Sequence, residues 1–119
     1  MADGYKVLAQ SELTASYATV YVVPTSTTST FATRNLIVSI VSSMTFCNTT
    51  GSTVQYYVRI VPSGDTAANK HVIIHNKDIA AKSTDIVSLG VGLQTGDVID
   101  MKADGTTRVS ASIFGIEII

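Results

Sequence analysis

Two histidines, His71 and His75, are the residues whose type and spacing come closest to a metal site. They stand four residues apart in the stretch NKHVIIHNK, and on a helix both could bind one zinc ion from the same face. Three consecutive β-branched residues lie between them and favour a strand, in which the two backbones would be roughly 13 Å apart. We therefore predict a strand that binds no metal, with an ion shared between subunits on a symmetry axis as the open alternative.

No other set of residues has the spacing of a catalytic motif. The sequence lacks a G-x-S-x-G nucleophile elbow and a phosphate-binding loop. Five of its aspartates stand beside Gly, Lys or Thr at predicted turns: Asp65, Asp78, Asp85, Asp97 and Asp104. Cys47 is the single cysteine, so the chain cannot form an internal disulfide. A Ser-His-Asp arrangement is neither supported nor excluded by the sequence. We expect a protein that is not an enzyme and that uses no catalytic residue, cofactor or metal.

The composition argues against partners that are recognised through charge. The 119 residues fit a single domain, residues 1–119. Charged residues make up 14% of the chain, the formal net charge is −1, and no two Lys or Arg residues are adjacent. Such a chain has no basic surface for a phosphate backbone, and its longest apolar run is much shorter than a membrane span. We expect neither nucleic acid nor a membrane as partner.

Apolar residues alternate with a period of two along most of the chain, which indicates β-strands. The turn sequences Asn48–Gly51 (NTTG) and Asp104-Gly105 separate alternating segments, and both favour hairpins. We predict an all-β, single-domain antiparallel β-sandwich, jelly-roll-like, with a small barrel as the competing architecture. The eight or so predicted strands are Tyr5–Gln10, Tyr17–Val23, Asn35–Cys47, Thr53–Val61, Lys70–Asn76, Thr84–Leu89, Asp97–Ala103 and Thr107–Ile118.

The alternation also assigns side chains to faces. In the third predicted strand the even positions are the more apolar, so Val38, Ile40, Met44 and Phe46 are expected to point into the core. Several residues on the opposite faces are apolar too. They fit either a thick core, with a bulge near Gly115 that turns Phe114 inward, or an interface between molecules. On the second interpretation the candidate interface residues are Ile37, Val41, Tyr57, Val61, Phe114, Ile116, Ile118 and Ile119.

Six short motifs occur in order along nearly the whole chain. They are YKVLAQ at 5–10, VVP at 22–24, FCN at 46–48, VRIVPSG at 58–64, KH at 70–71 and FGIEI at 114–118. In this order they resemble a family of small β-rich virion proteins of tailed bacteriophages. The resemblance implies a capsid decoration (cement) protein or a small tail-associated protein, and it supplies no catalytic motif.

The leading hypothesis is a cement protein that binds the outer surface of a phage head and stabilises the particle. Its expected partners are the major capsid protein and further copies of itself in a homotrimer, and its expected location is the virion, assembled in the host cytoplasm. The alternative is a small tail, neck or fibre component in which Tyr56, Tyr57 and the Thr-rich loops contact host glycans. A cellular binding module is a third hypothesis.

Overall fold

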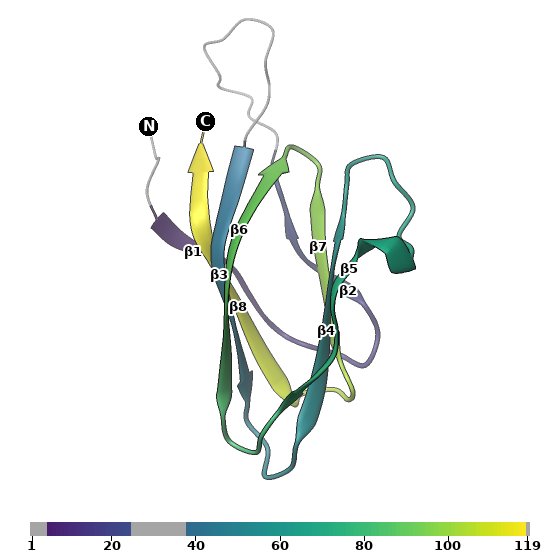
Figure 1. The fold of residues 1–119 in the computed structure, drawn as a ribbon, viewed down its shortest axis with the longest axis vertical. Helices are drawn as coiled ribbons and strands as arrows, with labels where there is room; N and C mark the ends of the chain where they lie inside the picture. The colour runs from purple at the N-terminus through teal and green to yellow at the C-terminus, as the bar shows by residue number, and fades with distance from the viewer. Residues whose placement is uncertain (1–4, 25–37, 119) are drawn as a thin grey trace, which may run out of the picture.

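A computed structural model describes residues 5–24 and 38–118 of the chain. These residues form two four-stranded antiparallel sheets that face each other as a sandwich (Figure 1). The strand order is β1-β8-β3-β6 in the first sheet and β2-β7-β4-β5 in the second. The elements are β1 Tyr5–Glu12, β2 Ala18–Val22, β3 Val38–Asn48, β4 Val54–Val61, the 3₁₀ turn η1 Asn69–His71, β5 Val72–Ile79, β6 Thr84–Gln94, β7 Val98–Ala103 and β8 Val109–Ile118.

This strand order is a jelly roll. Strand β1 pairs with β8, β2 with β7, β3 with β6 and β4 with β5, so the chain follows one long hairpin that is rolled into two layers. The predicted all-β sandwich is confirmed. The two predicted hairpins are wrong, because the turns after β3 and β7 lead from one sheet to the other. Turn residues specify a chain reversal, and they do not specify whether the flanking strands pair.

Several strand boundaries differ from the prediction for local reasons. The last strand begins at Val109 instead of Thr107, because Thr107 has a left-handed backbone with φ of 63°. The predicted strand from Lys70 begins at Val72, because η1 precedes it. In the described residues no helix is long and apolar enough to cross a bilayer. Positions 35–37 of the third predicted strand lie outside the described residues.

The core lies between the two sheets and is built around stacked aromatic rings. Phe46 of β3 and Tyr56 of β4 face each other with ring centroids 4.0 Å apart, and both side chains are fully buried. Because these strands belong to different sheets, the stack joins the two layers at their centre. Met44, Ile99 and Ile113 surround it and are also fully buried.

Two β-bulges in the first sheet change which side chains of its strands face the core. One lies between Val41 and Ser43 in β3 and the other between Val7 and Ala9 in β1, where each strand has an extra residue opposite β8. A one-residue shift moves the following side chains to the other face. Inward positions are therefore odd in β3 before the bulge and even after it.

This shift overturns part of the predicted core. Val41, predicted to face outward, is fully buried, whereas Val38 and Ile40, predicted to face inward, are 40% and 38% exposed. Strand β8 keeps its alternation, with Ile113 and Gly115 both buried and Phe114 half-buried between them. The predicted bulge near Gly115 therefore belongs to the strands beside β8, and it does not turn Phe114 into the core cluster.

Asn48 connects the end of β3 to two neighbouring turns. Its side-chain Nδ2 lies within hydrogen-bond distance of the carbonyl oxygens of Ser52, Ile79 and Ala80, at 2.7, 3.1 and 3.1 Å. Its Oδ1 accepts hydrogen bonds from the backbone N–H and the hydroxyl of Thr50, at 2.9 and 2.7 Å. The side chain is buried. Asn48 therefore acts as the shared hydrogen-bonding centre of the lower end of the sandwich in Figure 1.

Two tyrosines of the second sheet reach across the core to carboxylates of the first sheet. Tyr56 donates to Asp85 Oδ2 at 2.5 Å, and Tyr21 donates to Glu117 Oε2 at 2.5 Å. Each carboxylate also forms an ion pair with a lysine. Lys77 Nζ lies 2.9 Å from Asp85 Oδ2, and Lys6 Nζ lies 2.8 Å from Glu117 Oε1. We call these two arrangements the inter-sheet clasps.

The clasps shift the pKa values of their members in opposite directions. Burial raises the pKa of Asp85 and of Glu117, but the hydrogen bonds from lysine and tyrosine outweigh it and hold each pKa below its ordinary value. Burial and the bonds to carboxylates raise the pKa of both tyrosines. Carboxylates with a lowered pKa in the folded state stabilise it above their unfolded pKa, and this contribution is lost as the pH falls below about 4 through the folded pKa.

We expect Tyr56→Phe to lower the free energy of unfolding by about 1–2 kcal/mol at neutral pH, because it removes a partly buried hydrogen bond to a charged acceptor. The loss should be smaller at about pH 3, below the ordinary carboxyl pKa of about 4, because the stabilisation from a carboxylate whose pKa is lowered on folding is lost as the pH falls. The matched control is Tyr57→Phe, because the Tyr57 hydroxyl bonds an exposed side chain and its loss should cost about 0.5 kcal/mol or less. Urea denaturation at both pH values measures this, and an equal loss at the two values would contradict the clasp.

Candidate functional site: the outer face of the first sheet

The outer face of the β1-β8-β3-β6 sheet divides into two halves of opposite character. Strand register places Val38 beside Ile118, Ile40 beside Ile116, and Ile116 beside Tyr5. One row further down, Phe114 lies beside Val7. All of these side chains are at the end of the sheet where β1 begins and β8 ends, the upper end in Figure 1. We call this set the apolar half-face, and its members are Tyr5, Val7, Val38, Ile40, Phe114, Ile116 and Ile118.

The exposed apolar groups are concentrated on this sheet. Of the eight exposed large hydrophobic residues in the described part of the chain, six belong to the first sheet, and five of those six belong to the apolar half-face. The register places one charged side chain on the outer face of the described strands, Glu12, at the far end. Isolated exposed apolar residues are ordinary, but a contiguous set on one rigid face indicates a contact surface.

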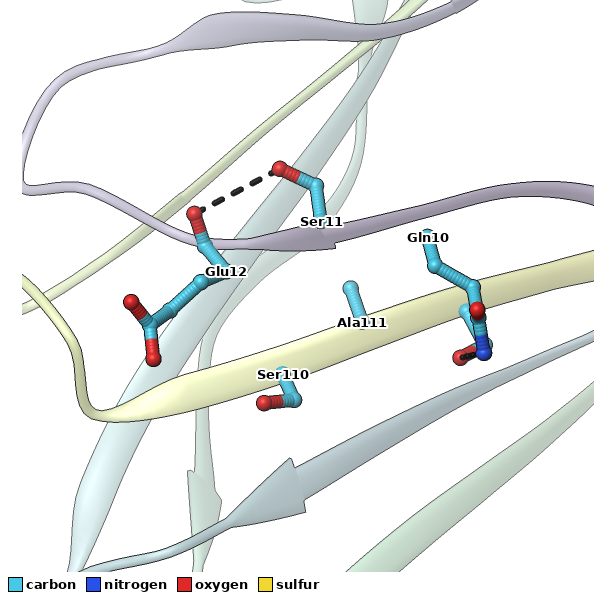
Figure 2. A pocket seen from close by; sticks show the side chains of 6 residues that line it. Gln10, Ser11, Glu12, Ser110 and Ala111 are labelled. Carbon is cyan, nitrogen blue, oxygen red and sulfur yellow. Dashed lines mark hydrogen bonds between the residues drawn. The ribbon is translucent and has the colours of Figure 1, made fainter.

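The other half of the face is rich in hydroxyl groups. Here the register brings together Ser112, Thr45, Ser110 and Thr84 from three strands. Figure 2 shows the shallow depression in this half, lined by Gln10, Ser11, Glu12, Ser110, Ala111 and Ser112. The amide of Gln10 donates to the Ser112 hydroxyl at 3.1 Å. The lining contains one carboxylate and no imidazole or amine, so it lacks a base beside its serines.

The structure separates the eight predicted interface residues. Phe114, Ile116 and Ile118 lie together in the apolar half-face. Val41 lies in the core, and Val61 is buried at 7% exposure, so neither is available on the surface. Tyr57 lies on the outer face of the second sheet, away from the others. Ile37 and Ile119 lie outside the described residues.

The outer face of the second sheet carries an aromatic–cation cluster. Arg59 Cζ lies 4.0 Å from the centroid of the Tyr17 ring, and Lys102 Nζ lies 4.8 Å from the same centroid. Lys102 Nζ is also 4.5 Å from the centroid of the Tyr57 ring. The two rings meet edge to face at 6.5 Å, and His75 meets Tyr57 edge to face at 5.3 Å. We call Tyr17, Tyr57, Arg59, His75 and Lys102 the aromatic–cation cluster.

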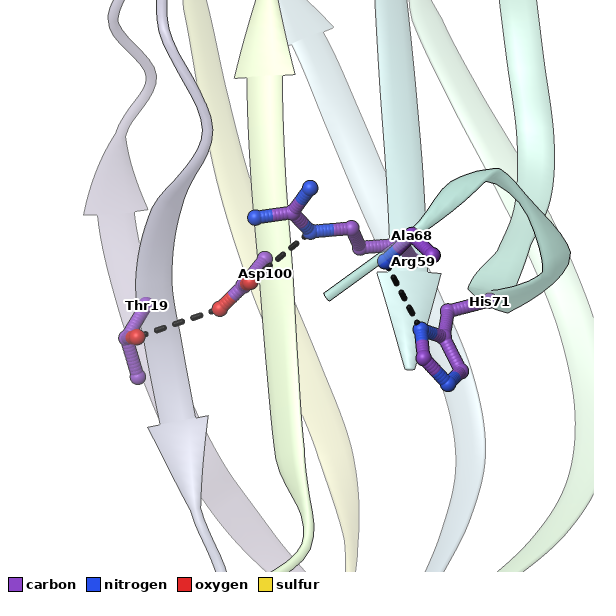
Figure 3. A network of polar contacts seen from close by, with 5 residues as sticks. All are labelled: Thr19, Arg59, Ala68, His71 and Asp100. Carbon is purple, nitrogen blue, oxygen red and sulfur yellow. Dashed lines mark hydrogen bonds and ion pairs between the residues drawn. The ribbon is translucent and has the colours of Figure 1, made fainter. Parts of the chain in front are cut away.

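A buried carboxylate orients the arginine of this cluster. Asp100 accepts from Arg59 Nε at 2.9 Å through Oδ2 and from the Thr19 hydroxyl at 3.1 Å through Oδ1. Figure 3 shows Asp100 on β7 between Thr19 on β2 and Arg59 on β4. The three strands are therefore linked across the outer face by one carboxylate.

The two histidines lie in different surroundings. His71 is buried in η1, where Nδ1 accepts the backbone N–H of Ala68 at 3.0 Å (Figure 3). Its Nε2 lies 3.4 Å from Asp65 Oδ2. An Nδ1 that accepts places the proton of a neutral ring on Nε2. His75 is exposed on β5 beside Tyr57. Within residues 5–24 and 38–118 no group of three or more His, Cys, Asp or Glu side chains is placed to hold a metal ion.

Sequence reasoning missed most of both surfaces. The alternation alone predicts Val38 and Ile40 in the core, because the bulge in β3 has no clear sequence signal. Tyr57 and Arg59 lie on the same face of β4, and this can be predicted from the sequence because they are two residues apart in a strand. Lys102 and Tyr17 join them only through the pairing of β7 with β4 and β2, and short-range patterns do not reveal such pairing. Tyr56, expected to contact glycans, is fully buried in the core.

Comparisons with known proteins give one structural likeness. No family model matches the chain, and no curated protein matches it. A chain in the solved "Structure of infectious bursal disease virus Gx strain" superposes on 96% of this chain, with a TM-score of 0.48 and 9% sequence identity. The present chain spans 30% of the length of that chain.

Proposed function

We propose that the protein is a non-enzymatic structural component of a virion, and that it decorates the outside of a phage head by docking its apolar half-face onto the major capsid protein. The observation that carries this proposal is the concentration of exposed apolar side chains on half of one rigid sheet face that has a single charge at its far end. The order of the sequence motifs supports the phage assignment.

The chemistry of the apolar half-face favours a protein surface as its partner. It combines aromatic and β-branched side chains at fixed spacing, which suits a partner of complementary shape. A nucleic acid would require clustered cations, and the described apolar half-face has none. The contact is therefore apolar and hydrogen-bonded, and it should persist in salt concentrations that screen surface ion pairs.

Many copies of the protein, each bound with modest affinity, are sufficient for such a role. An interface of roughly 1,000–1,500 Å² with micromolar affinity corresponds to about 8 kcal/mol per copy at the 1 M reference state. A ligand that binds only the closed shell stabilises it by mass action, and every copy contributes. Self-association into a homotrimer would further hide strand edges, since β1 and β6 are unpaired on their outer sides in the described sheet.

Particles that lack the protein test this function. We expect them to assemble and package DNA normally, but to release DNA at a lower temperature than complete particles, and we expect purified protein added back to restore the difference. The measurement is DNA release against temperature, together with the number of copies per particle, which should reach hundreds. Particles that are equally robust without the protein but fail to adsorb to cells would reject the cement role and favour the tail role.

A further inference from the structure

The aromatic–cation cluster carries positive charge that its own carboxylate does not neutralise. Two cations, Arg59 and Lys102, stand beside the single buried acid Asp100. Asp100 already accepts one bond on each oxygen, from Thr19 and from Arg59. Lys102 forms no ion pair among the described residues. Arg59, Lys102 and Asp100 together therefore carry one more positive charge than negative, on a protein whose formal net charge is −1.

The tyrosine rings position these cations and leave their donors free. Lys102 Nζ lies against the faces of both Tyr17 and Tyr57, where the ring quadrupoles attract the ammonium without accepting its protons as a carboxylate would. Arg59 pairs with Asp100 through Nε, so its Nη groups are not needed for that ion pair. Preoriented donors lose little conformational entropy when a ligand binds. The arrangement is suited to accept a small anion.

We propose that the aromatic–cation cluster binds the carboxylate of an acidic saccharide, such as a uronic acid unit of a surface polysaccharide. Arg59 and Lys102 would hold the carboxylate, and the partly exposed rings of Tyr17 and Tyr57 would contact the C–H groups of the sugar. The amide of Asn76, which bonds the Tyr57 hydroxyl at 2.9 Å, lies beside the cluster and can bond sugar hydroxyls. Two cations are too few for nucleic acid, which is bound through many phosphates.

This site does not depend on the proposed capsid contact. The apolar half-face belongs to the outer side of the first sheet, and the aromatic–cation cluster belongs to the outer side of the second. The two surfaces face in opposite directions across the sandwich (Figure 1). A molecule bound through one surface would therefore leave the other accessible.

Titration of the ¹⁵N-labelled protein with a short galacturonic acid oligomer tests the proposal. We expect chemical-shift changes confined to β4, β7, Tyr17 and the His75–Asn76 part of β5, and much weaker binding of a neutral galactose oligomer of equal length. Lys102→Gln should weaken binding by about tenfold, as expected for the loss of a charge-assisted hydrogen bond. Lys82→Gln is the matched control, because it removes the same charge from the exposed turn between β5 and β6.

A second variant separates the rings from the charge. Tyr17→Leu keeps both cations but removes the ring they share, and it should weaken binding by about fivefold. Equal weakening by Lys102→Gln and Lys82→Gln would reject the site. Equal binding of the neutral and acidic oligomers would reject recognition of the carboxylate. Inorganic phosphate that binds as tightly as the oligomer would reject recognition of the sugar.

Discussion

Gly115→Ala is expected to lower the free energy of unfolding by about 3 kcal/mol, and Gly115→Val to leave the domain unfolded. A β-carbon on Gly115 would overlap the backbone carbonyl oxygen of Ile40 and lie 3.1 Å from Leu8 Cδ1. The carbonyl belongs to a central strand and cannot rotate away as a side chain can. Relief would require β3 and β8 to separate, and these two strands pair along almost their whole length.

Gly92→Ala is the matched control for this prediction. Gly92 lies in β6 directly beside Ile40, on the opposite side of β3 from β8, and nothing lies within 4 Å of a β-carbon built on it. Its substitution should change stability by about 0.5 kcal/mol or less. Thermal or urea denaturation of the two alanine variants gives the comparison. If both variants have the stability of the unmodified protein, the close approach of β3 to Gly115 is not present in solution.

The neighbourhood of Gly115 also shows what the sequence could and could not predict. The period-two alternation was sufficient to predict an all-β sandwich, because each strand of a sandwich presents one apolar face to a shared core. The position of Gly115 in FGIEI suggested a bulge nearby, but which strand carries the extra residue depends on pairing between segments far apart in the chain. One misplaced bulge was enough to exchange Val41 with Val38 and Ile40 between core and surface.

Prediction of the turns from the sequence was limited in the same way, because the strands that a turn joins need not pair with each other. Asn48–Gly51 has the composition of a hairpin turn, and the chain does reverse there. The side chain of Asn48, however, bonds the connection between β5 and β6 as well as its own turn. This long-range role fixes the turn as a crossover between sheets, and it cannot be predicted from four consecutive residues.

Among the candidate interface residues, Phe114, Ile116 and Ile118 of β8 could be predicted from the sequence, because β8 alternates without interruption.

The apolar half-face gives the largest expected effect on function. Ile40→Asp should weaken binding of the protein to capsid shells that lack it by at least about 100-fold, because the contact would bury a carboxylate with no cation nearby to pair with it. Ile40 lies beside Ile116, the central residue of this surface, which has Ile40 on one side and Tyr5 on the other. Central positions carry most of the binding energy of an interface. Co-sedimentation with shells measures the affinity.

The control for this variant is Ile86→Asp, which makes the same substitution on the same sheet. Ile86 is the more exposed of the two isoleucines, at 67%, and it lies beside Thr45 in the hydroxyl-rich half of the face. Its substitution should change shell binding by about twofold or less. Because Ile40 is on a central strand, Ile118→Asp at the end of β8 provides a second test with less risk to folding. Ile40→Asp and Ile118→Asp variants that are folded and still bind shells as tightly as Ile86→Asp would show that the capsid contact lies elsewhere.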